Sequence, residues 1–427
     1  MEIVDIKRLN SIKYAQLRFI QKSEHNLFVT IIFVFIKAII SIFSFQRGKT
    51  VFKDIHVLAL TINNKKSVKG ILDNLPRDSY SIWSDKQNDV PNSIIYLKSF
   101  FYLPKLVRFY VQSDSRERII IRQYGLDFFR TCALYCEIDK IIKKNPHLKM
   151  ILFPNDHTLT SRCFIECAKK NNIRSLYVQH ASVSDVFPSL SFTYAFLDGK
   201  QSYDIYNKIG NIQSRIYLTG SPRFDSFFDT NKSEKTYDVG IALNSLDNIN
   251  RVLNLCLFIK DHYSHKILVR PHTGMIKEFN GDLFKEHGFE ISNPLIELSN
   301  VFLSKVKIMI ANESGIHLDA ALLRVPSILY NFSDRHIIDW YSYVKNGMIQ
   351  ESHTKEELIS RMKKGVEINN DAVRYYCASF GSSFEGKVGP FIATFISKNV
   401  YESEDASQLY VDTYMSNGGG FFFYKEV

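Results

Sequence analysis

The stretch Val306–Tyr330 reads VKIMIANESGIHLDAALLRVPSILY, and it decides the fold. Its first six residues form an apolar run that predicts a buried strand, and the polar corner Asn312–Gly315 follows. The next residues carry apolar side chains at helical spacing until Pro326, after which a second apolar run begins. This order of strand, corner, helix and strand is that of a βαβ unit, the building block of a parallel sheet covered by helices.

The corner of this unit is a candidate anion site. In a βαβ unit the helix begins at the carboxyl edge of the sheet, where free backbone N–H groups and the helix dipole favour an anion. Ser314 offers a hydroxyl, Gly315 lets the backbone approach a ligand, and Asp319 follows within reach of a sugar hydroxyl. We therefore expect the diphosphate and ribose of an activated-sugar donor here. The alternative is a capped helix that binds nothing.

Composition indicates a folded protein of two or three domains. The chain has 427 residues, 45% of them apolar, without repeats or low-complexity tracts. It has six cysteines without the spacing of a metal site or a disulfide framework, which predicts reduced core residues and a cytoplasmic protein: Cys132, Cys136, Cys163, Cys167, Cys256 and Cys377.

The positive charge is concentrated at the N-terminus. Residues 1–70 contain twelve Lys or Arg and four Asp or Glu, which accounts for +8 of the net charge of +10. No zinc-finger spacing, RNP-like motif or long Arg-rich arm supports nucleic acid as a partner. The charges surround an apolar segment, so we expect residues 1–50 to contact an anionic membrane surface on the cytoplasmic side.

The apolar segment itself is Leu27–Phe45. It has the length of a bilayer-spanning helix, but Lys37 lies near its centre and is costly there, and no cleavage site of a signal peptide follows. Three interpretations remain open: a helix in the membrane interface, a true span, and a helix buried against the protein.

The first half of the chain contains two strands that end in titratable residues. Met150–Phe153 leads into Asp156 and His157, and Ile173–Val178 leads into His180. Ligands of open parallel sheets collect at the carboxyl ends of the strands, so these side chains are candidate catalytic residues, with His180 or Asp156 as general base. The alternative is that they only cap the following loop and helix.

A tight corner precedes the predicted domain boundary. Gly220, Ser221, Pro222 and Arg223 form it, and a polar stretch through Asp238 follows as a linker. The expected organisation is an N-terminal helical segment over residues 1–50, a Rossmann-like acceptor domain over 51–230, a second Rossmann-like domain over 237–375, and a helix with a tail over 376–427 that returns to the first domain.

The second half repeats the pattern of the first. The strand Lys266–Val269 ends in Arg270, His272 and Thr273. An arginine can hold a phosphate with a bidentate fork and a histidine with one donated hydrogen bond, so Arg270 and His272 are candidate phosphate partners.

Four of these motifs together resemble a family pattern. Gly220–Asp225, Arg270–His272, Ser314–Gly315 with Asp319, and Gln179–Ala181 are similar to elements of GT-B glycosyltransferases. The resemblance is to the group of CDP-glycerol glycerophosphotransferases, capsule-building sialyl- and Kdo-transferases, and UDP-N-acetylglucosamine 2-epimerases. It implies two Rossmann-like domains facing across a cleft, with a hinge at the first motif, donor phosphate at the second, phosphate and sugar hydroxyls at the third, and a base or acceptor-positioning histidine at His180.

These observations predict a metal-independent glycosyltransferase of bacterial capsule or lipopolysaccharide synthesis, without a cofactor. Its partners would be a nucleotide-sugar donor on the second domain and a glycan acceptor on the first. Thr273 and Glu313, which adjoin the donor motifs, are counted among the donor-binding residues. Glycerophosphate transfer, sugar-nucleotide epimerisation and a non-catalytic role in membrane-bound assembly are the alternatives.

Overall fold

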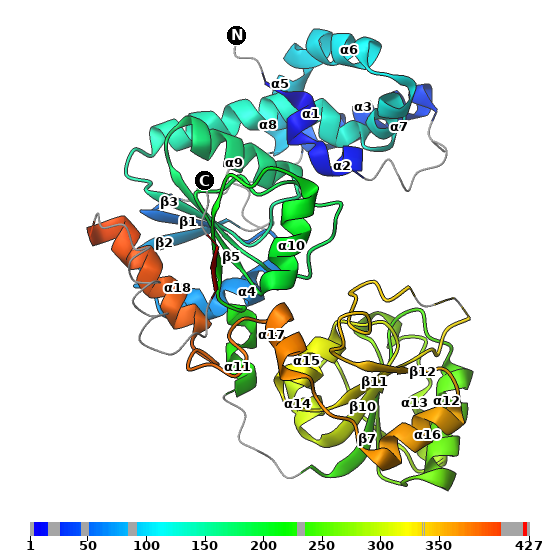
Figure 1. Cartoon of the computed structure of the whole chain (residues 1–427). Coiled ribbons are helices and arrows are strands. Elements are labelled where there is room, and N and C mark those ends of the chain that lie inside the picture. Colours follow the sequence, from blue (N-terminus) through cyan, green and yellow to red (C-terminus); the bar gives the residue numbers. More distant parts are fainter. Residues whose placement is uncertain are drawn as a thin grey trace. The chain divides into compact units, whose positions relative to one another are not determined.

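The computed structural model describes residues 4–15, 26–43, 51–83, 92–228, 235–334, 336, 338–402 and 422–424 (Figure 1). The chain divides into two compact units, of which unit 1 comprises Met1–Arg223 with Lys387–Val427 and unit 2 comprises Phe224–Gly386. Most of the predicted linker, residues 229–234, lies outside the described residues, as do residues 44–50 of the N-terminal segment and most of the tail.

Unit 1 is built on a seven-stranded sheet with the order β13-β6-β5-β4-β3-β1-β2. All neighbouring strands are parallel except β13, which pairs antiparallel with β6 at the edge. The central strands are fully buried and, apart from His56, apolar, as expected for a sheet covered on both faces. The strands are β1 (Ile55–Leu58), β2 (Tyr80–Trp83), β3 (Met150–Phe153), β4 (Arg174–Val178), β5 (Tyr194–Leu197), β6 (Arg215–Leu218) and β13 (Phe422–Tyr424).

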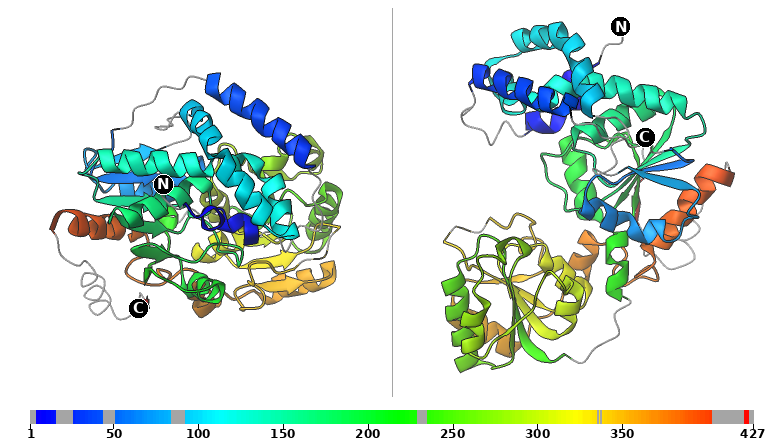
Figure 2. Two further views of the ribbon diagram at one scale, coloured as in Figure 1. Left: turned by 90° about the horizontal axis from the view of Figure 1, so that it is seen from above. Right: turned by 180° about the vertical axis from the view of Figure 1, so that it is seen from behind.

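Helices cover both faces of this sheet. Helices α8 (Gly125–Lys144) and α9 (Leu159–Lys170) pack together on one side, and α4 (Ile62–Leu72) packs with α18 (Val388–Ser397) on the other (Figure 2). The ring of Phe395 in α18 lies 5.1 Å from each of the rings of Tyr194, Phe196 and Tyr217 on the sheet. Helix α10 (Lys200–Ile209) connects β5 and β6, and the π-helix η5 (Lys398–Glu402) continues α18.

A further layer of helices packs on α8. Helix α3 (Leu27–Phe43) contacts α5 (Asn92–Ser99), α7 (Ser115–Gln123) and α8, and within the described ranges no helix is both long and apolar enough to cross a bilayer. The lysine Lys13 forms an ion pair with Asp127 of α8, which anchors the start of the chain. The other members of the layer are α1 (Ile6–Leu9), α2 (Ser11–Ala15), η2 (Phe100–Tyr102) and α6 (Leu103–Gln112).

Unit 2 is built on a six-stranded parallel sheet with the order β12-β11-β10-β7-β8-β9. The chain runs outward from β7 in one direction and then starts again at β10 on its other side, so the strand order reverses between these two neighbours. The strands are β7 (Tyr237–Ala242), β8 (Ile267–Arg270), β9 (Glu290–Ile291), β10 (Val306–Ala311), β11 (Ser327–Tyr330) and β12 (Gln350–Ser352).

Apolar clusters fill both sides of the sheet in unit 2. One cluster contains Val252, Leu255 and Leu358 from α12 (Ile249–His262) and α16 (Lys355–Lys364), and another contains Phe302 and Ala320 from α14 (Ser299–Ser304) and α15 (Ile316–Leu322). The remaining helices are η3 (Pro222–Phe224), α11 (Asp225–Phe228), η4 (Thr273–Met275), α13 (Gly281–Glu286) and α17 (Asn370–Tyr376).

The two helix-covered parallel sheets confirm the prediction of two Rossmann-like domains. Two predicted strands, those at Met150–Phe153 and Val306–Ala311, have the predicted bounds.

Candidate functional site

Polar side chains gather beyond the carboxyl ends of neighbouring strands in unit 1. Asp156 and His157 follow β3, and His180 follows β4, which pairs with β3 in parallel. The imidazole rings of His157 and His180 are stacked with their centroids 5.7 Å apart. The structure therefore brings together the three residues predicted as catalytic.

Asp156 orients His157. The carboxyl group of Asp156 is fully buried, and its Oδ1 lies 3.2 Å from Nδ1 of His157. A carboxylate oxygen only accepts, so the histidine donates from Nδ1 and presents the lone pair of Nε2, 3.2 Å from Nδ2 of Asn155. Asp156 therefore acts through His157.

His180 is a neutral imidazole at neutral pH. Burial, helped by the charges of His157 and Arg223, lowers the pKa of His180 to about 4, although Asp156 and a hydrogen bond to the backbone of Pro154 oppose the shift. Proline has no N–H, so its carbonyl accepts from the ring. The buried Nδ1 atom of His180 has no hydrogen-bond partner among the described residues, so its lone pair is available to accept a proton.

The predicted hinge motif belongs to the same edge of the sheet. Gly220 adopts a φ of 79°, which favours glycine, and the chain turns so that Arg223 points back to the strand ends. Nη1 of Arg223 donates to the carbonyl of His180 at 2.8 Å, and Nη2 donates to Oδ2 of Asp198 at 3.2 Å. Burial raises the pKa of Asp198 to about 6, while Arg223 and the hydroxyl of Ser221 oppose this shift.

Sequence reasoning missed the part that Asp198 and Gln179 play at this edge. The backbone N–H of Asp198 donates to Oε1 of Gln179 at 2.9 Å, and Nε2 of Gln179 donates to the carbonyl of Ala181 at 3.0 Å. These bonds tie together the loops after β4 and β5. Asp198 carries the signal that identified Asp156, a titratable residue shortly after a buried strand, and the same rule would have found it.

In unit 2 a polar network lies where the strand order reverses. Nδ2 of Asn312, after β10, donates to Oδ1 of Asp247 at 2.7 Å, and the backbone N–H of Asn244, after β7, donates to Oδ2 of Asp247 at 2.7 Å. Nδ2 of Asn244 also donates to the carbonyl of Glu313 at 3.2 Å. Burial raises the pKa of Asp247 to about 6. Ligands of open α/β sheets bind at such a topological switch point.

The corner that follows β10 is open. The backbone N–H groups of Ser314 and Gly315 have no acceptor among the described residues, and no atom outside the adjacent residues lies within 4 Å of the position of a Cβ on Gly315. Ser314 Oγ accepts from the N–H of Ile316 at 3.4 Å. Helix α15 contains only seven residues, so its dipole is short. The attraction for an anion at this corner would therefore come mainly from the two free N–H groups.

The loop between β11 and β12 packs on this corner. Oε1 of Glu313 accepts from the backbone N–H of Tyr341 at 3.1 Å, and burial raises the pKa of Glu313. The neighbouring Trp340 keeps 56% of its surface exposed. Neither Trp340 nor Tyr341 was predicted, because only the folded chain brings this loop to Glu313.

The other predicted donor residues have two kinds of surroundings. His272 is exposed, and its Nδ1 accepts from the N–H of Gly274 at 3.1 Å, so the neutral ring carries its proton on Nε2. Thr273 is also exposed at the start of η4. Arg270, in contrast, is buried and donates to Oγ of Ser292 at 2.7 Å and to the carbonyl of Glu297 at 2.8 Å. Its fork is thus engaged within the protein.

Asp319 is engaged as well. Its Oδ2 accepts from the hydroxyl of Ser299 at 3.0 Å, which links α15 to α14. Burial lowers the pKa of Arg270, and the charges of Glu297 and Asp319 oppose this shift. In the part of the chain that is described, no group of three or more His, Cys, Asp or Glu side chains could hold a metal ion.

Comparison with known proteins identifies the fold. No family model and no curated protein sequence matches this chain. Among solved structures, a UDP-N-acetylglucosamine 2-epimerase matches 84% of this chain and 98% of its own with 12% identity and a TM-score of 0.50. The UDP-GlcNAc 2-epimerase from Neisseria meningitidis, solved with UDP-GlcNAc bound, matches 81% of this chain and 100% of its own with 12% identity and a TM-score of 0.50.

The wall teichoic acid polymerase TagF is a further structural neighbour, with 13% identity, a TM-score of 0.41, and coverage of 72% of this chain and 98% of that one. At these identities the likeness concerns the fold alone. The epimerase structures cover both Rossmann-like domains of the chain, in agreement with the two sheets described above. The chain therefore has the two-domain GT-B fold that its motifs predicted.

Proposed function

We propose that this protein is a glycosyltransferase that transfers a sugar from a nucleotide-activated donor to a hydroxyl of a bacterial cell-surface glycan. The observation that carries the proposal is the pair of free N–H groups at Ser314 and Gly315, beside the topological switch point of unit 2. A structural neighbour of the same fold was solved with UDP-GlcNAc bound, which supports a donor of this class.

The donor diphosphate would lie at the corner after β10. The N–H groups of Ser314 and Gly315 and the Nε2–H of His272 would donate to its oxygens, and Thr273 and Glu313 border the site. Such donors stabilise the charge that develops on the leaving phosphate, which is usually the largest contribution to catalysis of group transfer. Arg270 and Asp319 would support the site through Ser292, Glu297 and Ser299.

The acceptor would be activated at the histidine pair of unit 1. Nδ1 of His180 would take the proton of the acceptor hydroxyl. At the same time the oxygen of this hydroxyl would form a bond to the anomeric carbon of the donor sugar. The bond from that carbon to the phosphate oxygen breaks, and its electron pair leaves with the nucleotide. Asp156 would hold the ring of His157, which stacks on His180. The corner Gly220–Arg223 would fix the loop that carries His180.

Nucleotide binding tests the donor site directly. Calorimetry with UDP, CMP and CDP should show binding of one of them to the wild-type chain, and Gly315→Glu should abolish it, because the new carboxylate would fill the open corner. His272→Ala should weaken binding, whereas His262→Ala, an exposed histidine on α12, serves as its control. Binding that survives Gly315→Glu unchanged would rule out this site.

Fluorescence gives a second measure of binding. The chain has two tryptophans, of which Trp83 is buried in unit 1 and Trp340 is exposed beside Glu313. An indole at this position can stack on a nucleobase. Quenching by the nucleotide should therefore be lost in Trp340→Phe and retained in Trp83→Phe.

Sugar-nucleotide epimerisation is the second candidate, because two structures that match with a TM-score of 0.50 are UDP-GlcNAc 2-epimerases. Both candidates predict nucleotide binding, so analysis of the product decides between them. A transferase needs an acceptor and releases the nucleotide, whereas an epimerase returns an altered sugar nucleotide without an acceptor. Turnover that persists in the presence of EDTA would support metal independence. A non-catalytic protein that only assists membrane-bound assembly would bind none of the three nucleotides.

A further inference from the structure

Helix α3 is exposed over most of its circumference. Only Val34 and Ala38 are buried, and they pack on Tyr96 and Phe129 of α5 and α8. Eleven large apolar side chains of α3 are between 38% and 80% exposed: Leu27, Phe28, Val29, Ile31, Ile32, Phe33, Phe35, Ile36, Ile39, Ile40 and Phe43. Contiguous apolar surface of this extent marks an interaction site, because soluble monomers rarely expose more than a few hundred Å² in one patch.

The surface continues beyond α3 onto the helices that follow β2. The rings of Phe35 and Phe100 lie 5.5 Å apart, and Leu103 and Leu106 of α6 pack against the cluster around Val34. These helices add five more large apolar side chains that are at least 38% exposed: Ile94, Leu97, Phe101, Val107 and Val111. We refer to the exposed apolar residues of α3, α5, η2 and α6 together as the α3–α6 face.

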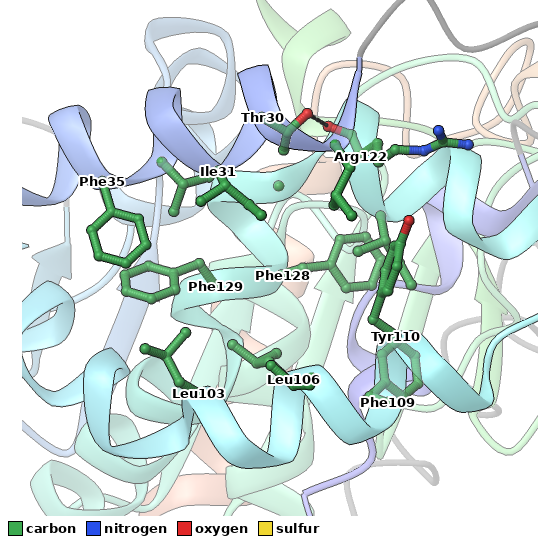
Figure 3. Close-up of a pocket in the computed structure, with 15 residues that line it drawn as sticks. Thr30, Ile31, Phe35, Leu103, Leu106, Phe109, Tyr110, Arg122, Phe128 and Phe129 are labelled. Atoms are coloured by element: carbon green, nitrogen blue, oxygen red, sulfur yellow. Dashed lines mark hydrogen bonds between the residues drawn. The ribbon is translucent and has the colours of Figure 1, made fainter.

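A groove runs through this face. It encloses about 280 Å³ between α3, α6, α7 and α8, and Figure 3 shows Ile31 and Phe35 of α3 opposite Leu103 and Leu106 of α6, with Phe128 and Phe129 of α8 between them. The hydroxyl of Thr30 in its wall already donates to the carbonyl of Arg122 at 3.1 Å. A polar ligand would find few partners in such a groove, whereas a hydrocarbon chain needs none.

The charged side chains on the helices that form the face all have one sign. Helix α3 and residues 92–112 contain no Asp or Glu and four basic residues, Lys37, Lys98, Lys105 and Arg108. Of these, Lys98 is paired with Glu137 of α8, and Nζ of Lys37 lies 5.8 Å from the ring centroid of Phe33. Basic residues around apolar side chains suit the anionic surface of a bilayer. A second copy of the same face would bring like charges together.

Helix α3 is held against the protein along one side. The first residue of α8, Gly125, lies so close to α3 that a Cβ there would be 2.6 Å from Cγ2 of Thr30. The buried stripe of α3 is thereby fixed on α8, and most of the other side chains of the helix remain exposed. A helix held in this way exposes one long side along its whole length and not only its end.

We propose that the α3–α6 face docks into the interface of an anionic phospholipid bilayer and that its groove takes an acyl chain of a bilayer lipid. Helix α3 would lie parallel to the membrane plane, with Lys37, Lys105 and Arg108 at the level of the headgroups and the apolar side chains below them. The inference does not depend on the nucleotide site, which belongs to unit 2.

Vesicle sedimentation tests the docking. The full chain should co-sediment with phosphatidylcholine vesicles that contain about one third phosphatidylglycerol, and less with phosphatidylcholine alone. The triple variant Phe33→Gln, Ile36→Gln, Ile40→Gln changes only exposed residues and should weaken binding at least about tenfold. The matched control Leu295→Gln, Ile296→Gln, Leu298→Gln changes exposed apolar residues of unit 2 and should bind as the wild type does.

A fluorescent reporter tests the groove. Val107 lines the groove and is 59% exposed, so Val107→Trp in a Trp340→Phe background places an indole at its mouth. Phospholipids brominated on the acyl chain should quench this indole more strongly than lipids brominated at the headgroup. Equal binding of the triple variant, quenching from the headgroup only, or a dimer in solution that does not bind vesicles would each overturn the proposal.

Discussion

Nη2 of Arg223 lies 3.2 Å from Oδ2 of Asp198, and the same guanidinium holds the carbonyl of His180. The pair is largely desolvated, because Asp198 is 3% exposed. The corner Gly220–Arg223 therefore has a defined task in unit 1: it neutralises a buried carboxylate and fixes the loop that carries the proposed base.

Removal of one member of this pair should destabilise unit 1. Arg223→Met leaves the carboxyl of Asp198 buried without its partner, and we expect a loss of about 3–5 kcal/mol in the free energy of unfolding, measured by urea denaturation with Trp83 as the probe. The double variant Arg223→Met, Asp198→Leu should recover most of it. Lys69→Met, which removes an exposed ion pair on α4, should cause no measurable change. An equal loss in the single and double variants would contradict this account.

His180→Ala should reduce turnover without reducing nucleotide affinity. Loss of a general base typically lowers the rate by about 10²–10⁴. Because the pKa of His180 is about 4, the base is unprotonated at neutral pH, so the wild-type rate should stay level as the pH falls from neutrality and decline only as the pH approaches that value. A parallel loss of nucleotide affinity in unit 2 would show that the substitution disturbs the fold instead.

The stability of unit 1 should depend on pH through His56. This residue is fully buried on β1, its Nδ1 lies 2.9 Å from Oγ of Ser81, and burial lowers its pKa from 6.5 to about 3. The unfolded chain binds the proton first, so this contribution to stability is complete above pH 6.5 and is lost as the pH falls toward 3, at about 1.4 kcal/mol per pH unit. His56→Gln should remove this slope, as measured by urea unfolding between about pH 7 and pH 5.

The comparison with wild type isolates His56 from other buried groups. Asp198 has a raised pKa of about 6 and acts in the opposite direction, because its folded form retains a proton longer than its unfolded form. Both proteins contain Asp198, so its effect cancels in the difference. An unchanged slope in His56→Gln would contradict the prediction.

Gly125→Ala should weaken the packing of α3 on α8. Alanine generally favours a helix more than glycine does, but at this first position of α8 its Cβ would lie 2.6 Å from Cγ2 of Thr30. We therefore expect faster amide hydrogen exchange in α3 and lower stability of unit 1. Gly281→Ala at the start of α13 is the control, because the nearest atom there lies 3.7 Å away. Slower exchange in the Gly125 variant would mean that α3 has room to adapt.

Apolar runs and the polar residues after them were sufficient to predict the fold and half of the candidate site. Val306–Ala311 could be predicted as a strand because, apart from Lys307, it is a short apolar run of the kind that forms a strand buried on both faces of a parallel sheet. The end of α15 was harder to predict: Arg324 takes a φ of 57° and the N–H of Val325 returns to the carbonyl of Ala320, which stops the helix at Leu322.

The remainder of the site depends on strand order, which local patterns do not contain. Asp247 lies 65 residues before Asn312 and meets it because β7 and β10 are neighbours. Arg270 was correctly placed at the end of β8, yet Ser292 and Glu297, which occupy its fork, come from the chain that follows the next strand. The helices of residues 92–144 had no predicted role, and the structure shows that they carry α3.

The position of α18 in unit 1 has a consequence for the order in which the protein folds. The ribosome completes all of unit 2, Phe224–Gly386, before Phe395 emerges to fill its place beside Tyr194, Phe196 and Tyr217. During synthesis the second unit can thus reach its native state while the sheet of the first still exposes one apolar flank. A nascent chain arrested after residue 386 should accordingly bind a chaperone through the part of unit 1 that was synthesised first.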